Sequence, residues 1–113
     1  MRIFWSTDAI EMADAFLEES KYVYGLKVFQ KHLDKIKLII HQLEKTPRSG
    51  PYEEALSDEE GEFRFRLIND RFKLVYRIID EQTLLIIALW DMRMNPEKLR
   101  LFVSDDGTGG YKL

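Results

Sequence analysis

An α+β fold is predicted by two features of this sequence: helical patterns fill its first half, and three short apolar runs separated by polar clusters fill its second half. The three runs lie between Phe63 and Arg93 and are typical of a three-stranded antiparallel meander, with turns at 69–71 and 80–82. We therefore expect the order β-α-α-β-β-β followed by a short C-terminal helix. The N-terminal strand and the meander would form one sheet, and an antiparallel helix hairpin would connect them.

Length and composition limit what this chain can be. With 113 residues, of which 45% are hydrophobic, it is expected to form one domain, 1–103, followed by a flexible glycine-rich tail, 104–113. The absence of cysteine excludes disulfides and thiolate metal sites. No apolar run approaches the roughly 20 residues of a membrane span, and the N-terminus lacks the apolar stretch of a signal peptide. We expect a cytoplasmic protein with no membrane partner.

The first elements follow from short local signals. Residues 2–5 are rich in strand formers and predict the N-terminal strand. Ser6, Thr7 and Asp8 are capping candidates, and Asp8 with Glu11 three residues later resembles a capping box. The apolar residues from Ile10 to Leu17 recur at helical spacing. These signals predict a first helix at about Asp8 to Ser20.

The second helix is predicted by a longer apolar seam, which follows a short break at 21–25. Apolar residues recur there at steps of three and four: Leu26, Phe29, Leu33, Ile36, Ile40 and Leu43. Proline and glycine within 46–51 end this pattern, and the next segment to residue 62, with six acids and no cation, is expected to be a solvated surface loop. Asn95 and Pro96 predict the start of a short helix reaching about Phe102.

The hydrophobic alternation of the strands predicts a cationic surface. If the strands place their apolar faces on one core, odd positions of the first run share a face with even positions of the second, because a one-residue slip turns every side chain over. The helices would then pack on Phe63, Phe65, Leu74, Tyr76, Ile86, Ala88 and Trp90. The opposite face would gather Arg64, Arg66, Lys73 and Arg93. A plain solvent-exposed face, whose arginines discourage edge-to-edge pairing, explains the same pattern.

Other chemical signatures are missing from the sequence. There is no P-loop and no dinucleotide-binding glycine pattern. His32 and His41 are nine residues apart on one predicted helix, so they lie on opposite sides of it and are expected to be ordinary surface histidines. The acids at 53–62 lack the glycine turn and ligand spacing of a calcium loop. We expect neither a metal nor a cofactor.

The order of the elements and several short motifs resemble the RelE/ParE superfamily of bacterial toxins from type II toxin-antitoxin modules. The resemblance covers about residues 1–99 and rests on four segments: 46–50, 63–67, 72–78 and 89–96. It implies that the partner is a cognate antitoxin, encoded by a neighbouring gene, that wraps an extended or helical segment over the toxin.

Two unlike activities occur in this superfamily. RelE-type toxins cleave mRNA on the ribosome without a metal, whereas ParE-type toxins are not nucleases and bind DNA gyrase. The resemblance places Arg64, Arg66, Lys73 and Arg93 where RelE-type toxins carry their catalytic cations. It therefore favours a RelE-like endoribonuclease that acts on the ribosome and mRNA; a gyrase inhibitor, or a degenerate member that only binds its antitoxin, is the alternative.

In the nuclease interpretation, Arg64 and Arg93 would neutralise charge on the scissile phosphate. Arg66 or Lys73 would transfer a proton, and Lys73 is the better candidate because arginine is a poor base. The sequence departs from RelE-type toxins at three points. Leu99 stands where those toxins place an aromatic residue, Lys73 stands where arginine is common, and the net charge of −3 is unlike that of strongly basic ribosome-acting members.

Overall fold

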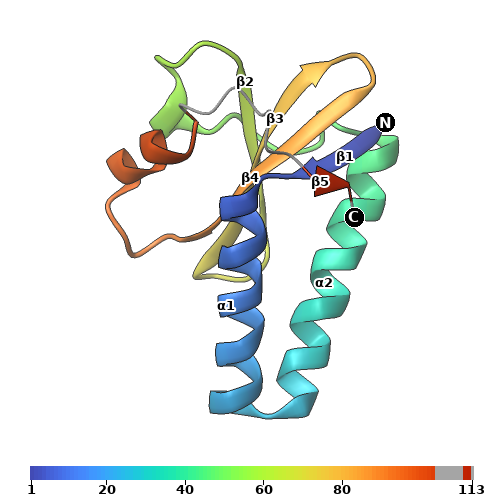
Figure 1. Cartoon of the computed structure of the whole chain (residues 1–113), viewed down its shortest axis with the longest axis vertical. Helices are drawn as coiled ribbons and strands as arrows, with labels where there is room; N and C mark the ends of the chain where they lie inside the picture. The colour runs from blue at the N-terminus through green and yellow to red at the C-terminus, as the bar shows by residue number, and fades with distance from the viewer. Residues whose placement is uncertain (104–110, 113) are drawn as a thin grey trace.

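The predicted order of elements is confirmed by the computed structural model, which describes residues 1–103 and 111–112. Its helices are α1 (Thr7–Tyr24) and α2 (Leu26–Lys45), with two short 3₁₀ helices, η1 (Glu54–Leu56) and η2 (Pro96–Phe102). Its strands are β1 (Arg2–Trp5), β2 (Glu62–Leu67), β3 (Phe72–Asp80), β4 (Thr83–Asp91) and β5 (Tyr111–Lys112). All the strands belong to one sheet (Figure 1).

The sheet is mixed, with the strand order β2-β3-β4-β1-β5. β2, β3 and β4 form the predicted antiparallel meander, while β1 runs parallel to β4, with Arg2 opposite Thr83. β5 pairs antiparallel with β1, and the rest of the predicted tail, 104–110 and 113, lies outside the described residues. The parallel pair joins the N-terminal strand to the last strand of the meander.

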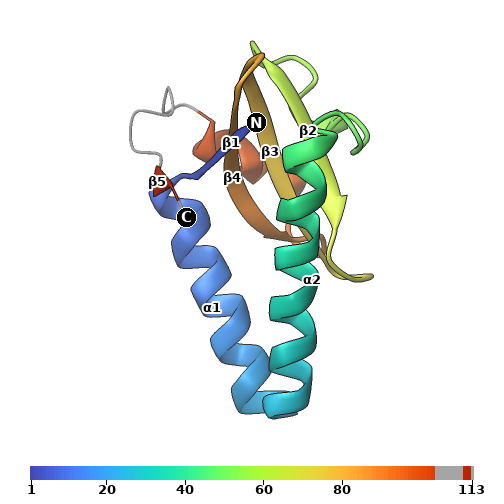
Figure 2. The ribbon, with the colours of Figure 1, turned by 90° about the vertical axis from the view of Figure 1, so that its right-hand side faces the viewer.

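The helix hairpin lies on one face of the sheet and extends well beyond it (Figures 1 and 2). Of the three capping candidates, Ser6 caps α1, and the capping box suggested at Asp8 is not the cap: Ser6 Oγ accepts a hydrogen bond from the Ala9 amide at 3.0 Å. α1 also continues to Tyr24, four residues past the predicted end. Gly25, with φ of 91°, ends α1 and immediately precedes α2, a backbone geometry that favours glycine.

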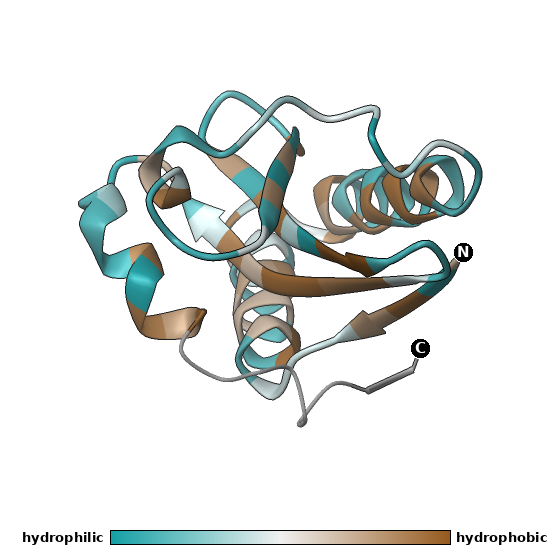
Figure 3. Ribbon diagram, turned by 90° about the horizontal axis from the view of Figure 1, so that it is seen from above, coloured by the Kyte–Doolittle hydropathy of each residue, from teal (hydrophilic) through white to brown (hydrophobic). Residues whose placement is uncertain are grey.

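The first core fills the space between the hairpin and the sheet. Apolar residues of both helices pack there against residues of the strands. In the ribbon of Figure 3, brown hydrophobic residues occur both along the strands and on the helices. The fully buried members of the first core include Ala9, Ile39, Leu43, Leu74, Tyr76, Leu84 and Ile86. This arrangement confirms that the helices pack on the sheet.

A second core covers the opposite face of the sheet. There η1 and η2 pack over the strands and bury Leu56, Phe63, Val75, Leu85, Ile87, Ala88, Trp90 and Leu99. Arg100 of η2 ties this cover together by pairing with Asp58 at 2.9 Å and Glu59 at 3.5 Å. The segment before β2 is therefore not simply the solvated loop that its acidity predicts, because Glu53 is 5% exposed and Leu56 is 1% exposed.

Candidate functional site

The strand register divides the four predicted site residues between the two faces of the sheet. Residues directly opposite each other in an antiparallel pair share a face. Arg64 lies opposite Tyr76, and Arg66 lies opposite Leu74, so both arginines share the face covered by the helices. Lys73 lies opposite Leu67 and Trp90, on the other face. The prediction that all four cations share one open face was therefore wrong.

Two structural features explain this error. The second core gives Phe63 and Phe65 an apolar environment away from the hairpin, so the strands have no single apolar face to fix the register. In addition, Val75 pairs with Ala88 and Tyr76 pairs with Ile86, so Ile87 is an extra residue, a β-bulge. The bulge moves Ala88 and Trp90, which were predicted under the helices, to the second core.

Arg64 and Arg66 join the edge strand β2 to the end of α2 and to the segment that follows it. Arg64 donates to Glu62 at 2.8 Å and to the Gly50 carbonyl at 2.7 Å, and its guanidinium lies 4.0 Å from the ring centre of Tyr52. Arg66 donates to the Gln42 side chain at 2.6 Å and to Ser49 Oγ at 3.1 Å. Both guanidinium groups are thus occupied by acceptors of the chain itself.

Glu62 is the carboxylate that neutralises positive charge at the edge strand β2. It accepts from Arg64 and also, through both carboxylate oxygens, from Arg48 at 2.9 and 3.0 Å. Partial burial alone would raise the pKa of Glu62, but the hydrogen bonds from Arg48 and Arg64 outweigh burial and hold that pKa below its usual range. Glu62 therefore stays ionised and neutralises positive charge that a phosphate would otherwise meet.

Lys73 lies buried on the opposite face. Its Nζ is 2.5 Å from Glu53 Oε1 and 4.7 Å from the ring centre of Phe65, and the side chains of Lys73 and Glu53 are only 11% and 5% exposed. Glu53 Oε2 also accepts from the Ala55 amide at 3.3 Å, at the start of η1. Lys73 thus holds η1 against the sheet through a buried ion pair, a position that does not fit a proton-transfer residue open to RNA.

Arg93 follows the end of β4 and is the exposed member of the predicted set, with 65% of its side chain accessible. It pairs with Asp91 at 3.1 Å. Asp91 also pairs with Arg71 at 3.2 Å, so one carboxylate holds two arginines at this corner. Leu99, which stands where RelE-type toxins carry an aromatic residue, is fully buried in the second core and is therefore closed to base stacking.

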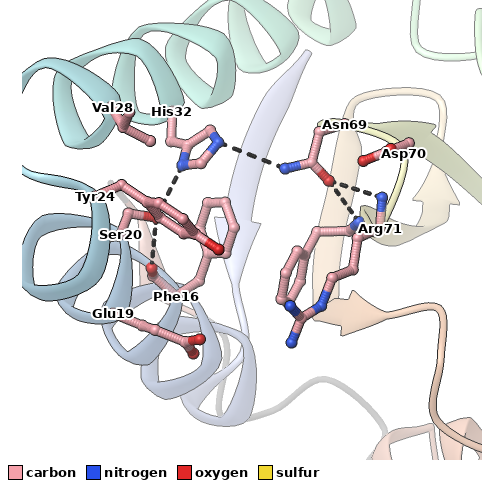
Figure 4. Close-up of a pocket in the computed structure, with 10 residues that line it drawn as sticks. Phe16, Glu19, Ser20, Tyr24, Val28, His32, Asn69, Asp70 and Arg71 are labelled. Atoms are coloured by element: carbon pink, nitrogen blue, oxygen red, sulfur yellow. Dashed lines mark hydrogen bonds between the residues drawn. The ribbon is translucent and has the colours of Figure 1, made fainter.

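A hydrogen-bonded chain centred on His32 was missed by the sequence analysis, which expected an ordinary surface histidine. His32 Nδ1 is 2.8 Å from Ser20 Oγ, and His32 Nε2 is 3.4 Å from Asn69 Nδ2 (Figure 4). Ser20 Oγ donates to the Phe16 carbonyl at 2.9 Å. Since His32, Ser20 and Asn69 come from α2, α1 and the turn between β2 and β3, spacing along the sequence gives no signal for this chain.

The directions of these hydrogen bonds follow from the other partners of the two outer residues, Asn69 and Ser20. Asn69 Oδ1 accepts from the backbone amides of Arg71 and Phe72, so Asn69 Nδ2 must donate to His32. His32 Nε2 is then the acceptor, and Nδ1 carries the proton that is donated to Ser20. Partial burial, followed by the charge of Lys31, lowers the pKa of His32 below 6.5, which favours this neutral form.

Several hollows lie along the hairpin. A pocket of about 280 Å³ lies around the His32 chain, between α1, α2 and the turn at 69–71 (Figure 4). A more apolar groove of about 390 Å³ lies between the two helices, with Trp5, Leu17 and Ile40 among its lining residues. Within 1–103 and 111–112, no cluster of three or more histidines and acids is placed to hold a metal. No helix in that part of the chain is long and apolar enough to cross a membrane.

Comparisons with known proteins agree with this architecture. Residues 3–96 match the family model described as the ParE toxin of the type II toxin-antitoxin system, parDE. A solved structure, "YoeB/ParE toxin from Agrobacterium tumefaciens", matches with a TM-score of 0.58 and 21% identity, over 80% of this chain and 98% of that chain, a likeness of fold. No curated protein sequence matches.

Fold and family match together define a toxin component of a type II toxin-antitoxin module. The chain belongs to the ParE toxin family, within the RelE/ParE superfamily that its sequence resembles. This membership implies a cognate antitoxin as its partner.

Proposed function

We propose that this toxin inhibits DNA gyrase by protein contact and is not a nuclease. The observation that carries the proposal is the occupation of all four predicted catalytic cations by partners within the chain. Arg64, Lys73 and Arg93 pair with carboxylates, and Arg66 is held by an amide and a hydroxyl. The strand register separates Lys73 from Arg64 and Arg66.

The placement of these four cations matters because phosphoryl transfer without a metal depends on cationic side chains held around the reacting phosphate. Donors that stabilise a transition state must converge on the atoms where charge develops, before the reaction begins. Here Arg64 has a side-chain exposure of only 12%, Lys73 of only 11%, and Lys73 faces the second core. Recruiting both to one phosphate would require breaking a partly buried ion pair, Arg64–Glu62, on one side of the sheet and a buried one, Lys73–Glu53, on the other. A toxin that works through protein contact has no such requirement.

Two assays with purified toxin test the proposal. We expect inhibition of supercoiling by DNA gyrase and intact message when ribosomes, mRNA and toxin are combined and read by primer extension. Arg93→Ala should leave gyrase inhibition within a few-fold of the parent, because this exposed residue would lose at most a peripheral contact. The growth of a bacterial host should stop on induction of the toxin alone and recover when the neighbouring antitoxin gene is co-expressed.

The opposite pattern would overturn the proposal. A RelE-like nuclease would cleave message at codons while gyrase remained active, and Arg93→Ala would reduce cleavage by roughly 10²- to 10³-fold, since it removes a transition-state donor. Arg93→Lys would restore only part of that rate, because an ammonium group cannot make the planar two-point contact of guanidinium with phosphate. A protein that binds its antitoxin but affects neither target would be a degenerate member of the family.

A further inference from the structure

The far end of the helix hairpin, residues 21–30, contributes nothing to the core, and we call it the hairpin tip. Within 21–30 no residue is buried, and the buried residues of the hairpin resume only at Ile36. Figures 1 and 2 both show this end projecting away from the sheet. Packing of the toxin domain therefore does not explain why the hairpin is so long.

The hairpin tip exposes large apolar side chains. Tyr22 is 93% exposed, Tyr24 62% and Leu26 67%, and Val23, between the two tyrosines, is 56% exposed. Tyr22, Val23 and Tyr24 form the last turn of α1 and Leu26 is the first residue of α2, so together they surround the end of the hairpin. Contiguous exposed apolar surface marks a site of contact with another molecule, and tyrosine is enriched among the residues that dominate binding energy.

The charge of the hairpin tip indicates the sign of the charge on the partner's surface. The hairpin tip contains two lysines, Lys21 and Lys27, and no acid, although the whole chain has a net charge of −3 and Glu18, Glu19 and Asp34 lie just outside the tip. The first turn of α2 also contains no acidic residue, and no side chain caps it. The hairpin tip is thus a cationic end of an acidic protein, complementary to an acidic surface.

A pocket next to the hairpin tip gives the partner a point of attachment. Tyr24 and Val28 line the pocket of about 280 Å³, whose far wall is the turn carrying Arg71 (Figure 4). The apolar rings of Phe16 and Phe72 line it as well. Its position beside Tyr24 and Val28 allows a side chain of the partner to enter it.

We propose that the hairpin tip is the surface with which this toxin contacts its target protein, at an acidic surface around an apolar recess. The inference rests on the proposed function, which makes the target DNA gyrase. It assigns target contact to one end of the hairpin and the adjacent pocket, and leaves Arg64, Arg66 and Lys73 out of the interface.

The test compares the parent with hairpin-tip variants in binding to purified gyrase holoenzyme, measured by surface plasmon resonance. Tyr22→Ser/Tyr24→Ser should weaken binding by about 30-fold or more, the cost of losing a dominant interface residue, and should weaken supercoiling inhibition in parallel. Leu26→Ser should also weaken binding, whereas Leu101→Ser, which alters a residue 69% exposed on η2, should stay within about two-fold. Lys21→Glu/Lys27→Glu should weaken binding most at low salt.

Each variant is first checked for unchanged melting and for unchanged affinity for the purified antitoxin. If the parent binds gyrase and Tyr22→Ser/Tyr24→Ser binds equally well, the hairpin tip is not the contact, although the proposed function stands. If the parent does not bind gyrase, both proposals fail. Loss of antitoxin binding in the hairpin-tip variants would assign this surface to the antitoxin. Binding of the parent to anionic phospholipid vesicles, or self-association abolished by the variants, would likewise overturn the inference.

Discussion

Tyr76 shows at the scale of one residue how a core position can also hold a loop. Its side chain is fully buried, its hydroxyl donates to the Pro47 carbonyl at 2.7 Å, and it accepts from the Gly50 amide at 3.2 Å. A Cβ on Gly50 would lie 2.1 Å from the Phe65 carbonyl oxygen, so glycine is required there. Hydrophobic alternation predicted that Tyr76 is buried, but it contains no information about what the hydroxyl contacts.

We expect Tyr76→Phe to destabilise the protein by about 1–3 kcal/mol, because the buried Gly50 amide and the partly buried Pro47 carbonyl lose their partner. The measurement is urea unfolding, with Tyr52→Phe, at a residue 60% exposed, as the control. Burial also raises the pKa of Tyr76 above 10, so its contribution is complete below about pH 10 and is lost as the pH rises through the folded pKa. Tyr76→Phe should remove the part of the stability loss at high pH that comes from ionisation of this hydroxyl. If the free energy of unfolding of the variant fell with pH as steeply as that of the parent, Tyr76 would not be its cause.

At the scale of secondary structure, the sequence was sufficient for most of the elements, missed η1 and β5, and was insufficient for the faces of the strands. Local signals predicted the strands, the hairpin and the short helix, because turns, caps and apolar periodicity act within a few residues. The faces depend on long-range facts: a bulge at Ile87 and a second core supplied by η1 and η2. Both sides of the sheet are apolar, so alternation alone could not decide on which side Arg64 or Lys73 lies.

The ion pair between Lys73 and Glu53 is expected to act as a structural link between β3 and η1. Lys73→Met should cost about 3–5 kcal/mol, because it leaves the Glu53 carboxylate buried without its partner. Lys73→Met/Glu53→Met should recover most of that loss, since two apolar side chains of similar volume leave no buried charge. Chemical denaturation of the two single variants and the double variant measures this coupling. Additive losses would argue against the link.

At the scale of the whole molecule, the His32 chain ties the projecting hairpin to the sheet. It connects α1, α2 and the turn between β2 and β3, and the charged residues Glu19, Asp70 and Arg71 line the same pocket. Protonation of His32 at Nε2 would place an N–H against the donor of Asn69 and remove one connection. The hairpin should therefore be held to the sheet less firmly in acid.

We expect the free energy of unfolding to fall as the solution is acidified. Since the pKa of His32 is lowered in the folded state, its contribution is complete above about pH 6.5 and is lost as the pH falls through the folded pKa. His32→Gln should remove this part of the pH dependence, and Asn69→Asp should raise the pKa of His32 by adding an acceptor charge. Titration of the His32 ring by NMR checks both; a midpoint above 6.5 in the parent would contradict the proposed neutral form.

The parallel pairing of β1 with β4 also determines when the sheet can be completed during synthesis. Arg2 pairs with Thr83, and Ser6 Oγ reaches the carbonyl of a residue 81 positions later in the sequence. At roughly 5–20 residues per second, β1 emerges from the ribosome about 4–16 s before its partner strand. Both helices are complete within that interval, but their apolar faces have no sheet to cover. The nascent toxin thus passes through a period in which the hairpin surface is open, and the antitoxin or a chaperone can reach that surface before the domain closes.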